Sequence, residues 1–103
     1  MVTVTWTKRS LIDLEDIAEY ISKDSIKYAK ITIKSIIREV TVLDRNPLVG
    51  RIIPEFNDKN FRELIKGNYR IIYFYGEQKV NILTVHHSAR DLKKRGILSF
   101  DNE

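Results

Sequence analysis

The sequence predicts an α+β domain in which a two-helix hairpin packs on one face of an antiparallel sheet. Three observations support this prediction: a strand-like alternation at the N-terminus, two apolar stripes at helical spacing, and three strand-like runs separated by short turns. The predicted order is an N-terminal strand, an antiparallel helical hairpin and three antiparallel strands, β-α-α-β-β-β.

The N-terminal residues predict a strand with one buried face. Val2, Val4 and Trp6 alternate with threonines, and this period of two is typical of a half-buried strand. The threonine that follows, Thr7, or else Ser10, can cap a helix by accepting a hydrogen bond from a free amide of its first turn.

Two apolar stripes at spacings of three and four residues predict the helices. Ser25 is a candidate cap for the second helix, after a break at residues 22–25, and Asn46-Pro47 ends it because the residue before proline disfavours the helical region. Two helices joined by a short polar link form an antiparallel hairpin. The first stripe is Leu11, Leu14, Ile17, Ala18 and Ile21, and the second is Ala29, Ile33, Ile36, Val40 and Leu43. A row of basic residues lies outside the second stripe. It is either a solvated helix face or a contact for DNA or an acidic partner, and its members are Lys27, Lys30, Lys34 and Arg38.

The second half of the chain predicts a loop followed by the sheet. Residues 48–60 contain Gly50 and Pro54 with mixed polarity, which indicates a loop. The turns at residues 66–68 and 76–79 contain glycines that can adopt a positive φ. The basic segment after Ser88 is predicted to be a short helix or a loose tail, with residues 1–98 forming one domain and 99–103 a disordered end. The predicted strands are Phe61–Ile65, Tyr69–Tyr75 and Val80–His87.

The turn lengths predict the register of the two hairpins. A four-residue turn pairs Tyr75 with Val80, and a three-residue turn pairs Ile65 with Tyr69. A slip of one residue would move a strand's whole set of side chains to the other face. The predicted register places on one face of the sheet Arg62, Arg70 and His87.

These three side chains are candidate members of an RNA-cleaving site. Cleavage without a metal needs a base, an acid and cations on the phosphate. His87 suits proton transfer because the pKa of histidine lies near neutrality, and Arg62 and Arg70 can grip phosphate oxygens. The alternative is that the arginines border a protein-binding surface and the histidine simply ends a strand.

Composition narrows the classes of function. The chain has 103 residues, a formal net charge of +4 and a sequence pI near 9.4, which favours acidic partners such as nucleic acid or a negatively charged protein segment. It has no cysteine and two histidines, so thiol chemistry is excluded and neither a metal site nor a cofactor is expected. The N-terminus is not a signal peptide and no apolar run could span a bilayer, so we expect a cytoplasmic protein.

Three motifs in this order resemble the RelE/ParE superfamily of toxins from type II toxin–antitoxin systems. They are Arg62–Leu64, Gly67–Tyr73 and Val85–Leu92, and the likeness runs from the first strand to about Leu92 and includes Asn46-Pro47. The sequence is most similar to the ParE, or plasmid-stabilisation, branch. The resemblance implies a toxin neutralised by an antitoxin that wraps its groove. RelE-like members cut messenger RNA in the ribosomal A site, whereas ParE-like members bind DNA gyrase and trap its DNA-cleaved state.

The residues that the RNA-cleaving members of the superfamily use are only partly present in this sequence. Arg70 matches an arginine of the RNA-cleaving members, and Arg62 lies near their lysine pair, although Leu64 occupies the second position. Ser88 stands where those members carry an essential arginine or histidine, and no tyrosine follows Asp91. The resemblance therefore implies a ParE-like inhibitor of gyrase. The alternative is a RelE-like, ribosome-dependent mRNA endonuclease that uses Arg62, Arg70 and His87.

The expected partners are a cognate antitoxin and DNA gyrase, or in the alternative the ribosome and mRNA. The toxin–antitoxin complex is expected to be oligomeric, and no membrane partner is expected. The residues predicted to contact the target or the antitoxin are Arg51, Arg62, Arg70, His87, Arg90, Lys93, Lys94 and Arg95.

Overall fold

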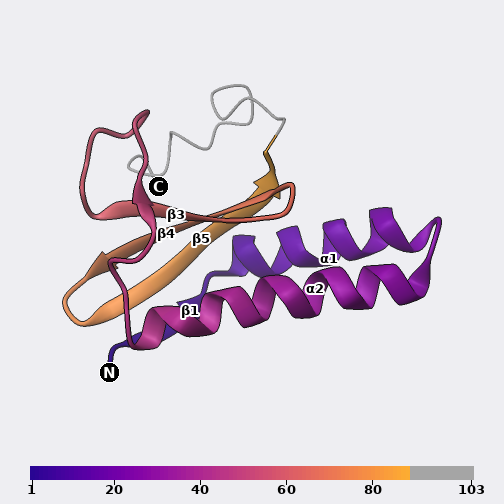
Figure 1. The fold of residues 1–103 in the computed structure, drawn as a ribbon, viewed down its shortest axis with the longest axis horizontal. Coiled ribbons are helices and arrows are strands. Elements are labelled where there is room, and N and C mark those ends of the chain that lie inside the picture. Colours follow the sequence, from indigo (N-terminus) through magenta and orange to yellow (C-terminus); the bar gives the residue numbers. More distant parts are fainter. Residues whose placement is uncertain (89–103) are drawn as a thin grey trace.

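A computed structural model describes residues 1–88, which form a five-stranded sheet with a helical hairpin on one face (Figure 1). The strands lie in the order β1-β5-β4-β3-β2, so the N-terminal strand is at one edge of the sheet. β1 runs parallel to β5 and the other neighbours are antiparallel. The strands are β1 (Thr3–Trp6), β2 (Arg51–Ile52), β3 (Phe61–Lys66), β4 (Tyr69–Gly76) and β5 (Lys79–His87).

The predicted element order is confirmed, with two differences. The sheet is mixed rather than antiparallel, because β1 lies parallel to β5. The predicted loop at residues 48–60 contains the short strand β2, which pairs with β3 through Arg51 and Ile52. A strand of two residues has no periodicity of its own, so its sequence could not reveal it.

Both predicted helix starts are confirmed by their caps. α1 (Lys8–Ser22) begins after Thr7, whose side chain accepts a hydrogen bond from the Ser10 amide at 3.2 Å. α2 (Ile26–Thr41) begins after Ser25, which accepts from the Tyr28 amide at 3.0 Å. The helix α2 ends somewhat before Asn46-Pro47, because a 3-10 turn, η1 (Val42–Asp44), lies between them.

The main core lies between the hairpin and the sheet. Ile36, Val40 and Leu43 of the second apolar stripe are fully or almost fully buried there. Leu11 of the first stripe is exposed, so the buried face of α1 is narrower than the pattern predicts. The strands contribute Leu64, Ile71, Tyr73, Val80, Ile82 and Val85 to this core.

A smaller core lies on the other face of the sheet. Ile72 alternates with the core residues Ile71 and Tyr73 and packs with Ile53, which belongs to the segment after β2. Figure 1 shows this segment passing over the sheet face that the helices leave uncovered. The aromatic rings of Phe56, Phe61 and Phe74 pack edge to face here.

The predicted register is wrong by one residue in two places. The turn between β3 and β4 contains only Gly67 and Asn68, so Lys66 pairs with Tyr69 and Ile65 with Arg70. In the β4–β5 hairpin Tyr75 pairs with Val80 as predicted, but a bulge between Ile72 and Tyr73 shifts the outer half. Beyond the bulge, pairs are Ile71–Val85, Arg70–His86 and Tyr69–His87.

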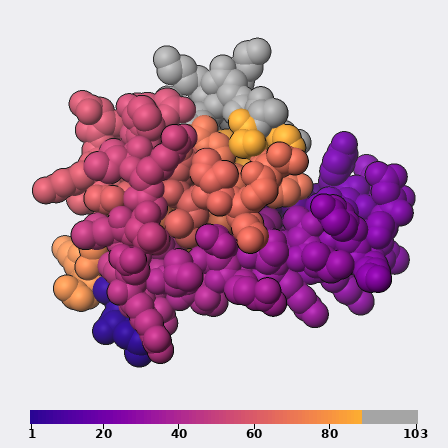
Figure 2. Space-filling view, viewed as in Figure 1, coloured from indigo at the N-terminus to yellow at the C-terminus, as the bar shows by residue number. Residues whose placement is uncertain are grey.

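The helical hairpin extends beyond the strands at one end (Figure 1). Its outer half, which contains the link between α1 and α2, extends past the ends of the strands (Figures 1 and 2). Within residues 1–88 no helix is long and apolar enough to cross a membrane.

Candidate functional site

A fully buried carboxylate, Glu63, organises the polar side of the sheet opposite the hairpin. Its two oxygens accept hydrogen bonds from Arg51 Nε and Arg70 Nε, each at 2.5 Å. The side chain of Glu63 has no exposed surface, whereas that of Arg51 is 62% exposed. Burying a carboxylate without partners would cost several kcal/mol, so the two guanidinium groups make this position tolerable.

Arg70 is held from two sides. Besides Glu63, its Nη1 lies 3.8 Å from Glu55 Oε2, and its side chain is only 11% exposed. A guanidinium paired with two carboxylates has little free charge to offer a phosphate. We conclude that Arg70 fixes the loop after β2 to the sheet.

The side chain of Arg62 donates hydrogen bonds to backbone carbonyls. Its Nε donates to the carbonyl of Lys59, and its Nη1 donates to those of Leu48 and Gly50, at 3.0–3.1 Å. Register places Arg62 opposite Tyr73, on the side of the sheet that faces the hairpin. Arg62 therefore holds both ends of the loop that carries β2.

Tyr73 holds the same loop from inside the core. Its hydroxyl donates to the Pro47 carbonyl at 2.7 Å and accepts from the Gly50 amide at 3.0 Å. Burial raises the pKa of Tyr73, and this effect outweighs the Gly50 hydrogen bond and the Arg62 charge, which lower it. A Cβ at Gly50 would lie 2.6 Å from the Tyr73 hydroxyl, so no side chain fits there.

His87 ends β5 beside a groove of about 650 Å³ between this strand and α1. Its ring contacts Tyr69 edge to face, with 5.6 Å between the ring centroids. The preceding histidine, His86, is buried, and its Nδ1 lies 3.0 Å from the His87 carbonyl oxygen. The α1 side of the groove carries Asp16 and Glu19, so this part of a basic protein is locally acidic.

The prediction that Arg62, Arg70 and His87 share one face is wrong. The one-residue differences in register put Arg62 and Arg70 on opposite faces of the sheet. His87 lies opposite Tyr69, which alternates with Arg70 along β4. Arg51 and Arg70, in contrast, are brought together by Glu63. The other predicted contact residues, Arg90, Lys93, Lys94 and Arg95, lie outside the described residues.

Two buried carboxylates were not singled out from the sequence. Asp13 accepts hydrogen bonds from Thr84 Oγ1 at 2.5 Å and from the Val85 amide at 3.0 Å, which ties α1 to β5. Asp13 lies one residue before the apolar position Leu14, and Glu63 lies between Phe61 and Ile65 on one strand face. A charged residue within an apolar face signals a paired, buried charge.

A second, apolar groove follows the seam between the outer halves of α1 and α2. It has a volume of about 440 Å³ and is called the seam groove below. Two lysines and two isoleucines line its α2 side, and small residues from both helices line the rest. The lining residues are Ala18, Ser22, Ile26, Ala29, Lys30, Ile33 and Lys34. Among residues 1–88 no three histidine or carboxylate side chains are placed to hold a metal ion.

Comparisons with known proteins agree with this architecture. A family model described as the ParE toxin of the type II toxin–antitoxin system parDE matches residues 4–92. No curated protein matches the chain. The structure is similar to that of a chromosomal ParDE system from P. aeruginosa, with a TM-score of 0.72 and 19% identity over 84% of this chain and 96% of that chain.

Two further solved structures share the fold. The RelBE2 toxin–antitoxin complex of Mycobacterium tuberculosis has a TM-score of 0.60 and 23% identity, over 84% of this chain and 96% of that chain. The YoeB dimer of Staphylococcus aureus has a TM-score of 0.56 and 16% identity, over 84% of this chain and 95% of that chain. The family model spans most of the chain and the fold agrees with it; the chain belongs to the ParE toxin family of type II toxin–antitoxin systems, within the RelE/ParE superfamily.

Proposed function

We propose that this ParE-family toxin acts in the cytoplasm by binding DNA gyrase and trapping it with its DNA cleaved, and that a cognate antitoxin neutralises it. The match to the ParE toxin family supports the role as a toxin, and the ParE-like motifs of the sequence support gyrase as the target. The solved RelBE2 relative is a toxin–antitoxin complex, which supports a similar, oligomeric complex here.

One observation favours gyrase over messenger RNA as the target. A metal-free nuclease needs its base, its acid and its phosphate-binding cations around one point. Here Arg62 is committed to backbone carbonyls on one face, and Arg70 is paired with Glu63 on the other. Each missing catalytic group typically lowers the rate by about 10²–10⁴-fold, so a toxin of this arrangement is better explained by protein binding.

The exposed cations are the proposed contacts to partners. Arg51 is the best placed of the described residues, because its side chain is largely exposed while Glu63 fixes its Nε. His87 lies at the mouth of the groove beside α1. Arg62 and Arg70 belong to the proposed set through the loop that they hold, which carries Arg51, and the basic residues at positions 90–95 complete it.

The test is to add the purified toxin to gyrase and supercoiled plasmid. We expect linear DNA to accumulate after the protein is denatured, and the antitoxin to suppress it. In parallel, translating ribosomes with a labelled message should give no new RNA ends. Codon-specific RNA cleavage without DNA breaks would overturn the proposal and support the nuclease alternative.

Two substitutions sharpen this test. Arg70→Lys keeps a positive charge near Glu63 but removes the forked guanidinium that a phosphate clamp needs. His87→Gln removes the imidazole as an acid or base. We expect both variants to retain the formation of DNA breaks with at most about a tenfold loss, the share of one contact, whereas a nuclease that used these groups for catalysis would lose about 10²–10⁴-fold.

A further inference from the structure

The groove between α1 and β5, called the acidic groove below, is lined by a buried carboxylate, that of Asp13. Asp13 is only 8% exposed, and its Oδ2 accepts hydrogen bonds from the Thr84 hydroxyl and the Val85 amide. Among residues 1–88, Asp13 forms no ion pair and its other oxygen, Oδ1, accepts no hydrogen bond. A buried carboxylate is ordinarily paired with a cation, as Glu63 is. The described part of the chain therefore leaves Asp13 without a counter-ion.

The acidic groove gives a ligand access to this carboxylate. Its volume of about 650 Å³ lies within the range of small-molecule sites, about 300–1,000 Å³. The exposed Asp16 follows on the next turn of α1, an axial rise of about 4.5 Å from Asp13, and also lines the groove. Glu19 adds a third carboxylate. Negative charges that share a groove raise the local concentration of cations, so this row of carboxylates favours a ligand with more than one positive charge.

Aromatic rings line other parts of the acidic groove. Tyr20 of α1 and Tyr69 of β4 contribute two of them. The ring of Tyr20 already attracts an ammonium group, since Lys23 Nζ lies 6.0 Å from its centroid. Aromatic faces attract organic cations, and methylene stems pack on apolar surface while their ammonium groups stay polar. Carboxylates and aromatic rings together therefore fit an organic ammonium ion.

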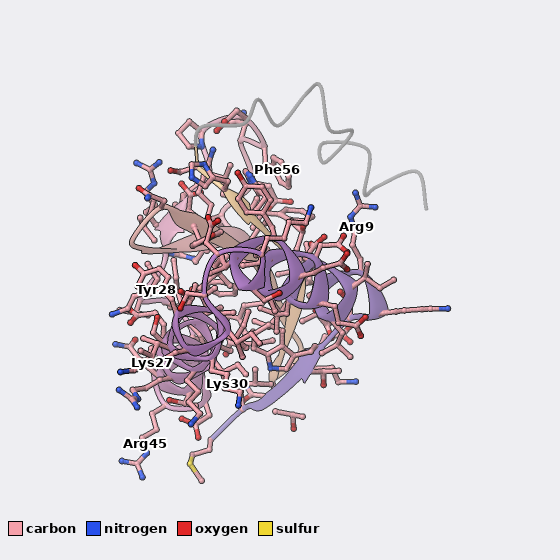
Figure 3. The ribbon with its side chains drawn as sticks, turned by 90° about the vertical axis from the view of Figure 1, so that its right-hand side faces the viewer. Arg9, Lys27, Tyr28, Lys30, Arg45 and Phe56 are labelled. Atoms are coloured by element: carbon pink, nitrogen blue, oxygen red, sulfur yellow. The ribbon has the colours of Figure 1, made fainter. Side chains whose placement is uncertain are left out.

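A metal ion and an anion fit the acidic groove less well. Among residues 1–88 no three histidine or carboxylate side chains are placed to hold a metal ion. The basic side chains of the hairpin gather elsewhere: Figure 3 shows Lys27, Lys30 and Arg45 projecting from α2 and the turn after it, away from Arg9 of α1. An anion in the groove would face the carboxylates of α1, which repel it.

We propose that the acidic groove is a binding site for a linear organic diamine or polyamine. One ammonium group lies beside Asp13 and supplies the counter-ion that residues 1–88 do not provide, and the next lies beside Asp16. The methylene chain packs against the rings of Tyr20 and Tyr69. Since Asp13 already joins α1 to β5, a ligand bound there stabilises the folded protein. This inference goes beyond the proposed function and does not depend on the target of the toxin.

The test is calorimetric titration of the full chain with putrescine and with spermidine at constant ionic strength. We expect saturable binding of either amine at a single site. Mg²⁺ has the same charge as putrescine and should bind at least about tenfold more weakly, because general screening depends on charge, whereas the groove also selects an apolar stem. The melting temperature should rise with spermidine concentration.

Two substitutions with matched controls locate the site. Asp16→Asn should weaken spermidine binding by about fivefold or more, because one charge-assisted contact is lost. Its control is Glu15→Gln on the same helix, which lies outside the groove and should leave the affinity within about twofold. Tyr20→Leu should weaken binding by about threefold through loss of the ring face, and its control is Tyr28→Leu on α2 (Figure 3). All four side chains are exposed, so these variants should fold normally.

The outcomes decide between this site and simpler explanations. Equal binding by Asp16→Asn and Glu15→Gln, or equal affinity for spermidine and Mg²⁺, would reduce the interaction to general screening and overturn the inference. The basic residues at positions 90–95 carry the same chemistry as the amines, so a further variant combines R90S, K93S, K94S and R95S. If spermidine binds this variant but not the wild type, the chain's own basic residues occupy the groove and the inference is wrong. Equal saturation of both proteins supports it.

Discussion

At the scale of single residues, the burial and pairing of Glu63 indicate that its cluster of charges is structural and not catalytic. It is fully buried and accepts from two arginines of very different exposure, since Arg51 is largely exposed and Arg70 is not. Removal of one partner from a buried ion pair leaves a charge in the interior, whereas removal of an exposed partner changes little. The position of each group in the cluster therefore sets its contribution to stability.

The first prediction follows from that difference. Glu63→Gln should lower the free energy of unfolding by about 3–5 kcal/mol, because Arg70 is left in the interior without its carboxylate. Arg51→Ala should lower it by less than about 1 kcal/mol. Urea unfolding followed by circular dichroism measures both, and equal losses for the two variants would contradict this account of the cluster.

The second prediction concerns pH. Burial raises the pKa of Tyr73 above its ordinary value of 10.0, so above that pH the unfolded chain loses a proton that the folded protein keeps. The stability that depends on the neutral phenol is complete below pH 10 and is lost as the pH rises toward the folded pKa. At pH 8, Tyr73→Phe should cost about 1–3 kcal/mol, because the Gly50 amide and the Pro47 carbonyl lose their partner.

The measurement compares urea unfolding of wild type and Tyr73→Phe between pH 8 and pH 11. The difference in free energy of unfolding should be constant up to about pH 9 and then shrink, since phenylalanine does not ionise. The remaining tyrosines and all lysines are common to both proteins, so their titration cancels. A difference that stays constant to pH 11 would contradict a raised pKa.

At the scale of elements, local signals predicted the helices and strands but not their exact pairing. Thr7 and Ser25 act as caps because a side-chain oxygen next to a free amide is a local property that sequence carries. Register depends instead on turn geometry. The turn between β3 and β4 has only Gly67 and Asn68, with a positive φ at Gly67, so β3 and β4 pair one residue away from the predicted register.

The bulge in β5 explains why His87 of the candidate site was misplaced. Leu83 is the extra residue opposite the Ile72–Tyr73 step. Beyond it, each side chain of β5 lies on the opposite face of the sheet from the one predicted. The residues of the site were thus predictable by type, because Arg62 and Arg70 stand in recognisable motifs. Their separation onto two faces was not, because it depends on whether the turn between β3 and β4 has two residues or three, and the sequence around Gly67 allows both. The same holds for the seam groove, since Ala18 and Ile33 belong to the predicted apolar stripes and only the length of the hairpin beyond the sheet leaves them half-buried.

At the scale of the whole molecule, the buried ion pairs of Glu63 and the exposed apolar residues of the hairpin lie in separate regions. The Glu63 cluster stiffens one face of the sheet, while the hairpin carries exposed apolar residues beyond it. The largest of these exposures on the hairpin include Ile26 and Tyr20. A small domain with such a surface is expected to associate nonspecifically unless a partner covers it. The antitoxin should therefore act on the stability of the toxin as well as on its activity.

The last prediction is that the melting temperature of the toxin rises with antitoxin concentration. A partner that binds only the folded state adds about 4 kcal/mol to the free energy of unfolding when its free concentration is a thousand times the Kd. Differential scanning fluorimetry of the toxin at increasing antitoxin should give a transition that climbs with the logarithm of the concentration. A melting temperature of the wild-type toxin that does not respond to antitoxin would show that the partner does not recognise the folded chain described here.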